Sequence, residues 1–476
     1  MAPEQKQYET DTGAAHESAS TGEERASGNG ELARGLGGAA ATAIIMGGMI
    51  GSGIFRAPSI VADHVGSPGM SLVVWIVCGF VALAGGLCVA ELGAMMPKTG
   101  GLYVYLREAY PRRFVSFSYA WAAFWLIWPV SMAAVAAVFA TYLAVIVEAA
   151  TGVSLGVGGQ RTAAAAGIVS LALVNCVGVR TSGQLTTIVT ALKIASLAAI
   201  IALAALLGAG AAQTLPASAA ISATSAGFHP AAFGAAMITA LFAFEGWSYA
   251  GYVAGEIQQP QRTLPRAVIV GVLGVTTLYV AVNLAYMSVL PFEHFRSSDR
   301  VAADVMSALV GPAGGLAVSA AVMTSTFGAL HVLLLVAPRS AYALAQDRLF
   351  FQSLTRVHPI RRTPTNAIAA QAVLASAFVL SGRYDEIISL AAFPTYLYFL
   401  LTIIAVFVLR RTRPDAVRPY RAFGYPVTPL VCAGVIAGYL VTLLIEPSAL
   451  LRTVFGLLLI AAGIPFYLSW RKASDQ

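Results

Sequence analysis

The chain has 476 residues, of which 58% are hydrophobic and only 11% are charged, and its mean hydropathy is +0.75. Soluble domains carry about 25% charged residues, so this composition excludes the soluble class and predicts a polytopic membrane protein. The formal charge of +7 does not indicate a nucleic-acid partner, because the basic residues lie at the ends of apolar segments, where they report topology.

Residues 1–35 differ from the rest of the chain. They are polar, rich in Gly, Ser and Glu, and almost free of large apolar side chains. They lack the apolar h-region of a signal peptide. We therefore expect a disordered cytoplasmic tail.

Twelve apolar segments follow, each long enough to cross ~30 Å of hydrocarbon. We predict them at 36–63, 69–96, 114–147, 162–178, 183–208, 231–257, 266–290, 313–346, 366–381, 386–409, 425–445 and 449–470. With the N-terminus inside, the cytoplasmic segments hold 22 of the 29 Lys and Arg residues and the opposite side holds 5. This bias predicts that both termini are cytoplasmic.

The first predicted span contains the stretch "IIMGGMIGSGIFRAP", Ile44 to Pro58. Gly51, Ser52 and Gly53 fall in its middle. Non-helical backbone at that depth survives only where it is buried in protein or lines a wet cavity. The alternative is close helix packing through small residues, which Gly47-xxx-Gly51 also fits.

A second interruption occurs near Glu245-Gly246, in "LFAFEGWSYAGYVAGE". The two interrupted spans, the first and the sixth, each open a five-span half. Paired interruptions at corresponding positions of two halves are a pointer to the central site of a transporter.

The break in span 1 predicts a site for a zwitterion. Unwinding frees the N–H groups of Ser52, Gly53 and Ile54 at a half-helix N-terminus, where they attract a carboxylate. It also leaves carbonyls near Met49 and Ile50, which we expect to attract an ammonium. Glycine lets the substrate approach the backbone closely.

Several motifs resemble the amino acid–polyamine–organocation superfamily. They are "IGSGIF", "AELGAMMPKTGGLYVYLREAYP", "FAFEGWSYAGYVAGEIQQPQRTLPRA" and "APRSAYALAQDRLFFQSLTRVHPIRRTPTNAI". "LIWPVSMAAVAAVFATYL" and "NCVGVR" resemble the L-type amino acid transporter branch more narrowly. The resemblance implies an all-α membrane protein of 12 transmembrane helices, arranged as a five-plus-five inverted repeat with helices 1 and 6 broken and two extra helices.

The resemblance also implies a division of the chain and an activity. Residues 36–410 would form the transport core, and 411–476 the last two helices with a short cytoplasmic C-terminus. The activity implied is secondary active amino acid transport by alternating access, not enzymatic catalysis, and no cofactor is expected.

One feature departs from the animal L-type transporters, which bond to a single-span glycoprotein through a cysteine between spans 3 and 4. Here that loop, 148–161, has no cysteine. We expect no disulfide-linked heavy chain, and a stand-alone bacterial-type protein of the inner (cytoplasmic) membrane. The four cysteines, Cys78, Cys88, Cys176 and Cys432, lie in apolar runs without CxxC or Cys/His spacing, so we expect buried side chains and no metal site.

Lys193 lies about ten residues inside span 5, too deep for its side chain to reach water. A buried lysine in a membrane span is a functional hypothesis by default. By resemblance, its ammonium would replace the sodium ion of sodium-coupled relatives, touching span 1 carbonyls and Ser325. A proton carrier and a fixed cation in an exchanger both remain open.

Span 6 carries three further candidates. Glu245 is expected to line the site, with selection of cationic substrates as the alternative. By resemblance, Phe242 closes over the substrate, and Ala243 is expected among the substrate-binding residues.

The L-type branch also implies a mid-sized, mostly apolar side-chain pocket from Ile127 and Ser131 on span 3 and Phe393 and Tyr396 on span 10. The full set of expected substrate-binding residues is Ile50, Gly51, Ser52, Gly53, Ile54, Phe242, Ala243, Glu245, Ile127, Ser131, Phe393 and Tyr396.

Several charged residues lie near the predicted ends of the spans. We interpret Glu91, Glu256 and Arg339 as solvated interface charges, with gate salt bridges as the alternative. Arg56 is expected to pair with Asp63 at the extracellular mouth.

The leading prediction is a transporter of neutral L-amino acids working by proton symport or exchange. The alternatives are a cationic amino acid or polyamine carrier using Glu245, and a solute sensor built on a transporter fold. A membrane enzyme would need a nucleophile–base or metal constellation, and a channel would need a filter or charged rings. Neither pattern is present in the sequence.

Overall fold

The structure is a computed structural model that describes residues 32–214, 229–382 and 384–474. Within these ranges the chain is helical, and the only β-type pairing is an isolated bridge between Leu36 and Ile257. Most of the expected N-terminal tail, residues 1–31, lies outside the described residues. The prediction of an all-α polytopic membrane protein is confirmed.

The first half of the bundle begins with a broken span. The helices α2 (Gly38–Met49) and α3 (Gly53–Val65) are bent by 46° across the Gly51-Ser52 break. The other elements of this half are α4 (Pro68–Met95), α5 (Leu102–Ala109), α6 (Phe114–Ala122), the π-helical turn η1 (Ala123–Ile127), α7 (Trp128–Thr151), α8 (Val157–Val177) and α9 (Val179–Thr214).

The second half also begins with an interrupted span. Here α10 (Pro230–Ala243) gives way to turns, the short α11 (Tyr249–Tyr252) and the 3₁₀ turn η3 (Ala254–Glu256). The remaining elements are α12 (Pro260–Val289), α13 (Phe292–Ser297), α14 (Val301–Val310), α15 (Pro312–Gln346), η4 (Gln352–Thr355), α16 (Thr365–Ser381), α17 (Tyr384–Thr412), α18 (Val427–Ile445), α19 (Pro447–Ala461) and α20 (Ile464–Ser474).

Length and composition qualify nine helices of the described residues as membrane spans, or ten if α2 and α3 count as one. The helices α10 and α16, which occupy two further predicted spans, are apolar but shorter. The count of twelve therefore stays a prediction. The helices α5, α13 and α14 lie outside every predicted span.

Local sequence explains where many helices begin and end. Proline stands in the first turn of α4, α10, α12, α15 and α19, where its missing N–H costs nothing. Gly66, Gly152 and Gly382 follow α3, α7 and α16 in the left-handed conformation that closes a helix C-terminus.

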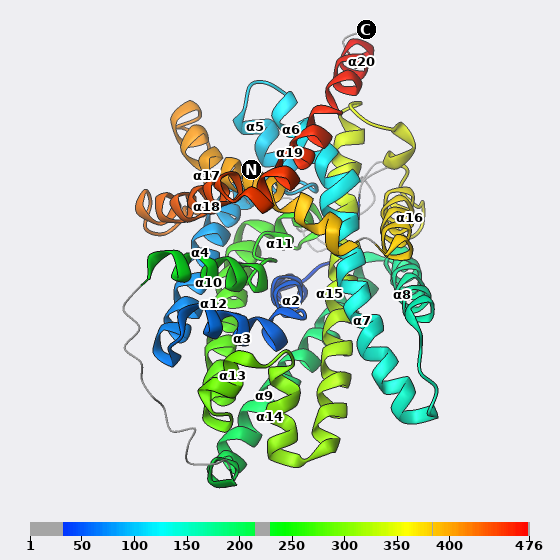
Figure 1. Ribbon diagram of the computed structural model, residues 1–476. Coiled ribbons are helices and arrows are strands. Elements are labelled where there is room, and N and C mark those ends of the chain that lie inside the picture. The colour runs from blue at the N-terminus through cyan, green and yellow to red at the C-terminus, as the bar shows by residue number, and fades with distance from the viewer. Residues whose placement is uncertain (1–31, 215–228, 383, 475–476) are drawn as a thin grey trace, which may run out of the picture.

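The two interrupted spans lie together at the centre of the bundle (Figure 1). The helix α10 packs against α3, and α11 packs against α2. Long helices surround them, with α12 and α9 against α2, and α15 against α7. The helices α13 and α14 lie at one end of the bundle, while α5 and α20 lie at the opposite end. This arrangement places both breaks in the interior.

Candidate functional site

The two breaks touch each other through their backbones. Gly246 has φ +138°, and a Cβ there would lie 2.8 Å from the Met49 nitrogen. A Cβ on Gly53 would lie 2.9 Å from the Ala243 Cβ. Only glycine permits these approaches. The glycines therefore bring the interrupted segments of spans 1 and 6 into direct contact.

The N-terminus of α3 has open hydrogen-bond donors. Ser52 occupies its N-cap without a side-chain capping bond, and the N–H groups of Ser52, Gly53 and Ile54 make no hydrogen bond among the described residues. A Cβ on Gly51 would meet nothing nearer than 4.0 Å, whereas one on Gly47 would lie 2.5 Å from the Thr190 hydroxyl. Gly47 is thus a packing glycine, while Gly51 leaves space beside free donors.

The carbonyl groups before the break are already occupied. The Met49 oxygen accepts from the Gly51 N–H at 2.9 Å and from the Tyr279 hydroxyl at 2.8 Å. The Ile50 oxygen accepts from Lys193 Nζ at 2.7 Å and from Ser325 Oγ at 3.0 Å. The expectation that these carbonyls are free for a substrate ammonium is wrong, because side chains of neighbouring helices reach them first.

Lys193 belongs to α9, and its ammonium group lies at the C-terminal end of α2. Its side chain is only 1% exposed, and Nζ also donates to the Gly47 oxygen at 2.7 Å. A cation at a helix C-terminus is favoured by the helix dipole. Gly328 on α15 makes room for it, because a Cβ there would lie 2.8 Å from the Lys193 Cε. Ser325 also donates to the Gly51 oxygen at 3.2 Å.

Tyr279 joins the two breaks and was not singled out from the sequence. Its hydroxyl lies 2.8 Å from the Met49 oxygen and 3.1 Å from the Ala243 oxygen. One hydroxyl hydrogen therefore serves a carbonyl from each interrupted span. The sequence feature that could have indicated this role is the position of Tyr279, a residue with a polar hydroxyl, in the middle of the apolar run 266–290.

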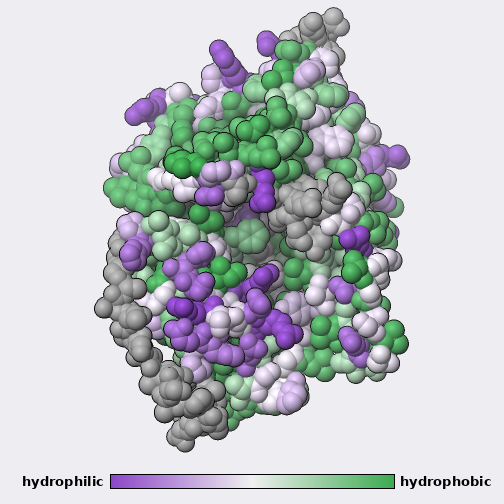
Figure 2. Space-filling model, viewed as in Figure 1, coloured by the Kyte–Doolittle hydropathy of each residue, from purple (hydrophilic) through white to green (hydrophobic). Residues whose placement is uncertain are grey.

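A cavity of about 1020 Å³ runs from the breaks toward α13 and α14. Of the expected substrate-binding residues, it is lined by Ser52, Gly53, Ser131, Phe242, Glu245 and Tyr396. A smaller cavity of about 80 Å³ beside it adds Gly51 and Ala243. In the space-filling view this face is hollowed at its centre, with hydrophilic residues gathered below the hollow over α3 and α13 (Figure 2).

Four expected residues lie elsewhere. Ile50, Ile54, Ile127 and Phe393 are buried and line neither cavity in this conformation. Ile127 ends the π-helical turn η1, and its carbonyl accepts from Ser131 Oγ at 2.8 Å. The π-helical turn widens the helix at this point, and the pocket role that the L-type resemblance implies for Ile127 stays a prediction.

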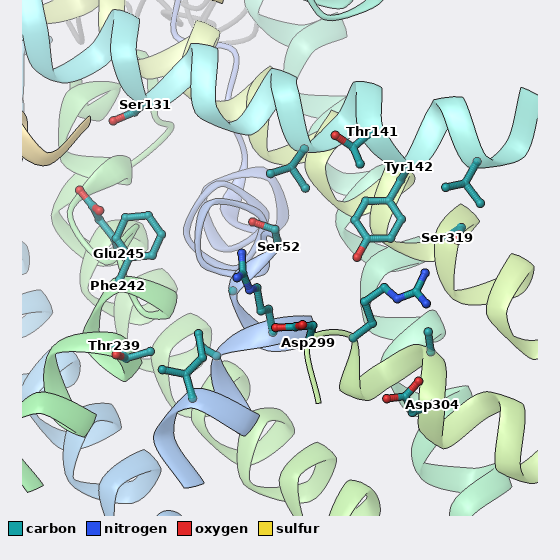
Figure 3. Close-up of a pocket in the computed structure, with 18 of the residues that line it drawn as sticks. Ser52, Ser131, Thr141, Tyr142, Thr239, Phe242, Glu245, Asp299, Asp304 and Ser319 are labelled. Carbon is teal, nitrogen blue, oxygen red and sulfur yellow. The ribbon is translucent and has the colours of Figure 1, made fainter. Parts of the chain in front are cut away.

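Glu245 lies at the inner end of the large cavity. Its carboxylate forms no hydrogen bond or ion pair among the described residues, and Glu245 lines both cavities. Figure 3 shows Glu245 next to Phe242, with Ser131 across from them on α7. Phe242 is 56% exposed and stands in the open path. The inner end of the cavity thus combines free N–H donors, a carboxylate and an exposed aromatic ring.

The opposite end of the bundle is closed by buried ion pairs. Arg339 donates to the Glu256 carboxylate at 3.0 and 2.9 Å, and the two side chains are 1% and 0% exposed. The interpretation of these residues as solvated charges is wrong, because chain segments pack over them. Leu36 covers this point, since its N–H donates to the Glu256 oxygen at 3.0 Å and its own oxygen accepts from the Gln258 N–H at 2.8 Å.

Two further contacts tie the same end together. Glu91, only 2% exposed, accepts from Arg410 at 2.9 and 2.6 Å and from the Ala422 N–H at 2.6 Å, so its assignment as a solvated charge is also wrong. The Tyr119 and Tyr252 hydroxyls lie 2.5 Å apart. The site is therefore open toward α13 and α14 and closed toward α5.

Other sequence expectations have clear outcomes. Asp63 lies 3.9 Å from Arg296, so the predicted pair of Arg56 with Asp63 is not formed. Cys78, Cys88 and Cys432 are buried as expected, and Cys176 is partly exposed. No group of three or more potential metal ligands occurs among the described residues.

Comparison with known proteins gives consistent matches over nearly the whole chain. The chain matches the family described as amino acid permease over residues 36–464. It is 31% identical over 437 residues to the serine/threonine exchanger SteT of Bacillus subtilis, covering 91% of this chain and 95% of that protein. It is also 31% identical to two human proteins. These are b(0,+)-type amino acid transporter 1, over 425 residues (89% and 85% covered), and large neutral amino acids transporter small subunit 2, over 404 residues (84% and 74%).

Proposed function

The chain belongs to the amino acid permease family, and from that premise we propose that it is a secondary active transporter of neutral L-amino acids that works by exchange. The observation that carries the proposal is the open N-terminus of α3. It presents the free N–H groups of Ser52, Gly53 and Ile54 beside a cavity that reaches one face of the protein. Such a terminus binds a carboxylate.

The substrate ammonium needs a different partner from the one expected. Since the Met49 and Ile50 carbonyls are occupied, we assign this role to the Glu245 carboxylate, which lines both cavities. An amino acid bound in this way would place its side chain toward Ser131 and Tyr396. Phe242 would close over it when the cavity contracts.

Exchange is favoured over proton symport by the surroundings of Lys193. Its ammonium is held by two carbonyl oxygens, each at 2.7 Å, at the end of a helix where a positive charge is stabilised. Losing the proton would remove that charge from a site built for a cation. The name of the B. subtilis relative, a serine/threonine exchanger, supports the same choice.

A second candidate, transport of cationic amino acids or polyamines, is supported by one observation. The Glu245 carboxylate has no partner among the described residues and faces the cavity. It could therefore meet the charged end of a substrate side chain instead of the α-ammonium.

We also propose that residues 36–410 form the transport core and that α18 to α20 are accessory. The positive-inside bias supports cytoplasmic termini in a bacterial inner membrane. In that orientation α13 and α14 are extracellular, and the conformation is outward-open. No disulfide-linked partner is proposed, because the connection between α7 and α8 has no cysteine.

The test is transport by the purified protein in liposomes, with radiolabelled neutral and cationic amino acids. Each is offered with an inward proton gradient or with unlabelled amino acid preloaded inside. Uptake of neutral amino acids only into preloaded vesicles is the expected result. Uptake driven by the proton gradient alone contradicts exchange, and absence of all uptake contradicts the transporter function.

A further inference from the structure

The cavity is larger than one amino acid requires. Its volume of about 1020 Å³ is at the upper end of the ~300–1,000 Å³ range of pockets that hold drug-sized ligands. The donors at Ser52 to Ile54 and the Glu245 carboxylate account only for its inner part. The outer part is lined by different residues, from the outer half of α3, from α7 and from the segment that leads into α14.

Two arginines line this outer part without a partner. Arg56 lies on α3 and Arg300 caps the N-terminus of α14. Neither guanidinium forms an ion pair or a hydrogen bond within the described ranges, whereas nearby Arg296 pairs with Asp63 and Glu293. An unpaired guanidinium that faces a cavity offers a planar fork of donors that matches a carboxylate.

Tyr142 brings the two arginines into one place. Tyr142, Arg56 and Arg300 line the same cavity. Figure 3 shows Tyr142 on α7 with its hydroxyl directed into the cavity, toward the side that carries Asp299. The outer part therefore groups two cations and a hydroxyl donor around one space.

Acidic side chains occur there as well. Asp304 accepts from Ser298 Oγ at 2.5 Å and lies 3.7 Å from His294 Nε2, so it is engaged. Asp299 lines the cavity and forms no ion pair among the described residues. A region with free guanidinium groups and one free carboxylate suits a zwitterion better than it suits a simple anion.

We propose that Arg56, Arg300 and Tyr142 form an outer subsite that binds the α-carboxylate of an amino acid before it reaches the inner site. This inference rests on the proposed function. An amino acid entering past α13 and α14 is captured by the two guanidinium groups, with its ammonium toward Asp299. It then moves inward to the free N–H groups of α3. Charges placed along an entry path in this way raise the local concentration of the substrate.

The test compares single variants in reconstituted vesicles, using the best-transported of radiolabelled serine, alanine and leucine. For Arg56→Gln and for Arg300→Gln we expect the KM of exchange to rise about tenfold while the maximal rate is retained, since a charged hydrogen bond is lost. Arg56→Lys should recover part of the affinity. Raising the salt concentration should raise the wild-type KM toward the variants' value, because exposed charges are screened.

Arg296→Gln is the matched control. Arg296 is an arginine of the same face that is paired with carboxylates and does not line the cavity, so its loss should leave KM unchanged. The subsite is refuted if the Arg56 and Arg300 variants behave like the Arg296 variant. It is equally refuted if they lose maximal rate at unchanged KM, which would make the arginines parts of a gate. If the wild-type protein transports none of the three amino acids, the proposed function itself fails.

Discussion

Lys193 and Ser325 donate to the same acceptor, the carbonyl oxygen of Ile50, at 2.7 and 3.0 Å. One side chain comes from α9 in the first half of the bundle and the other from α15 in the second half. Their shared acceptor is the last residue before the break in span 1. Both halves of the bundle therefore hold the broken span in place through one atom. We expect a substitution of either donor to alter the geometry of the substrate site.

For Lys193→Ala we expect loss of exchange and a lower melting temperature. The buried Gly47 carbonyl loses its lysine donor, which costs about 1–3 kcal/mol, and the Ile50 carbonyl keeps only the Ser325 hydroxyl. Exchange in preloaded vesicles and thermal unfolding in detergent measure the two effects. Ser196 on the same helix is half-buried, and among the described residues its hydroxyl bonds only to the Leu192 carbonyl of that helix, so Ser196→Ala should change neither. Full exchange activity in Lys193→Ala would contradict a fixed-cation role.

Gly328→Ala should impair transport by crowding Lys193 and the neighbouring Val189. A Cβ at Gly328 would lie 2.8 Å from the Lys193 Cε and 2.4 Å from the Val189 Cγ1, so the ammonium has to shift away from its two carbonyls. We expect the exchange rate of Gly328→Ala to be as low as that of a variant with a conservative substitution at Lys193, or lower. Gly315 lies on the same helix with no atom nearer than 3.7 Å to an added Cβ, and Gly315→Ala should be tolerated. Equal rates for the two variants would show that the space around Lys193 is not critical.

Tyr279→Phe should weaken the connection between the two interrupted spans. The change removes the donor shared by the Met49 and Ala243 oxygens. The Met49 oxygen keeps the Gly51 N–H, whereas the Ala243 oxygen has no other donor among the described residues, a cost of about 1–3 kcal/mol. Tyr286 provides a control on the same helix, because it is fully buried and its hydroxyl has no partner within the described part of the chain. Thermal unfolding and substrate KM should therefore change in Tyr279→Phe and not in Tyr286→Phe.

Much of this arrangement follows from the sequence, and the exceptions have physical reasons. Apolar length predicts the spans, and the glycine-containing interruptions predict both breaks, because non-helical backbone survives at such depth only where it is buried in protein or lines a cavity. Tertiary partners of backbone atoms were not predictable, since the approach of Tyr279 to Met49 depends on how α12 packs. The burial of Glu256 and Arg339 was missed for the same reason. A charge near a span end is solvated or covered according to segments far away in the chain.

Glu256→Gln should open the closed end of the bundle. Removing one partner of a fully buried ion pair leaves Arg339 uncompensated, which costs about 3–5 kcal/mol. If this pair holds that end closed, its loss should lower the thermal stability and increase the accessibility of a cysteine introduced beside it. Glu293→Gln breaks an ion pair in which the glutamate is 75% exposed, and should have little effect. An unchanged melting temperature in Glu256→Gln would mean that the ion pair does not hold the end closed.

Glu245→Gln distinguishes the two substrate assignments. If the carboxylate binds the α-ammonium of every substrate, the neutral amide should raise the KM of neutral and cationic amino acids by similar factors, roughly tenfold for one charged hydrogen bond. If it selects a charged side chain, uptake of lysine and arginine should fall while neutral amino acids keep most of their rate. The ratio of the two KM changes is the deciding measurement, because a general loss of folded protein lowers both maximal rates without altering that ratio. Thr239 lines the same cavity, and its hydroxyl bonds only to the Ala235 carbonyl among the described residues, so Thr239→Val controls for a change of cavity polarity.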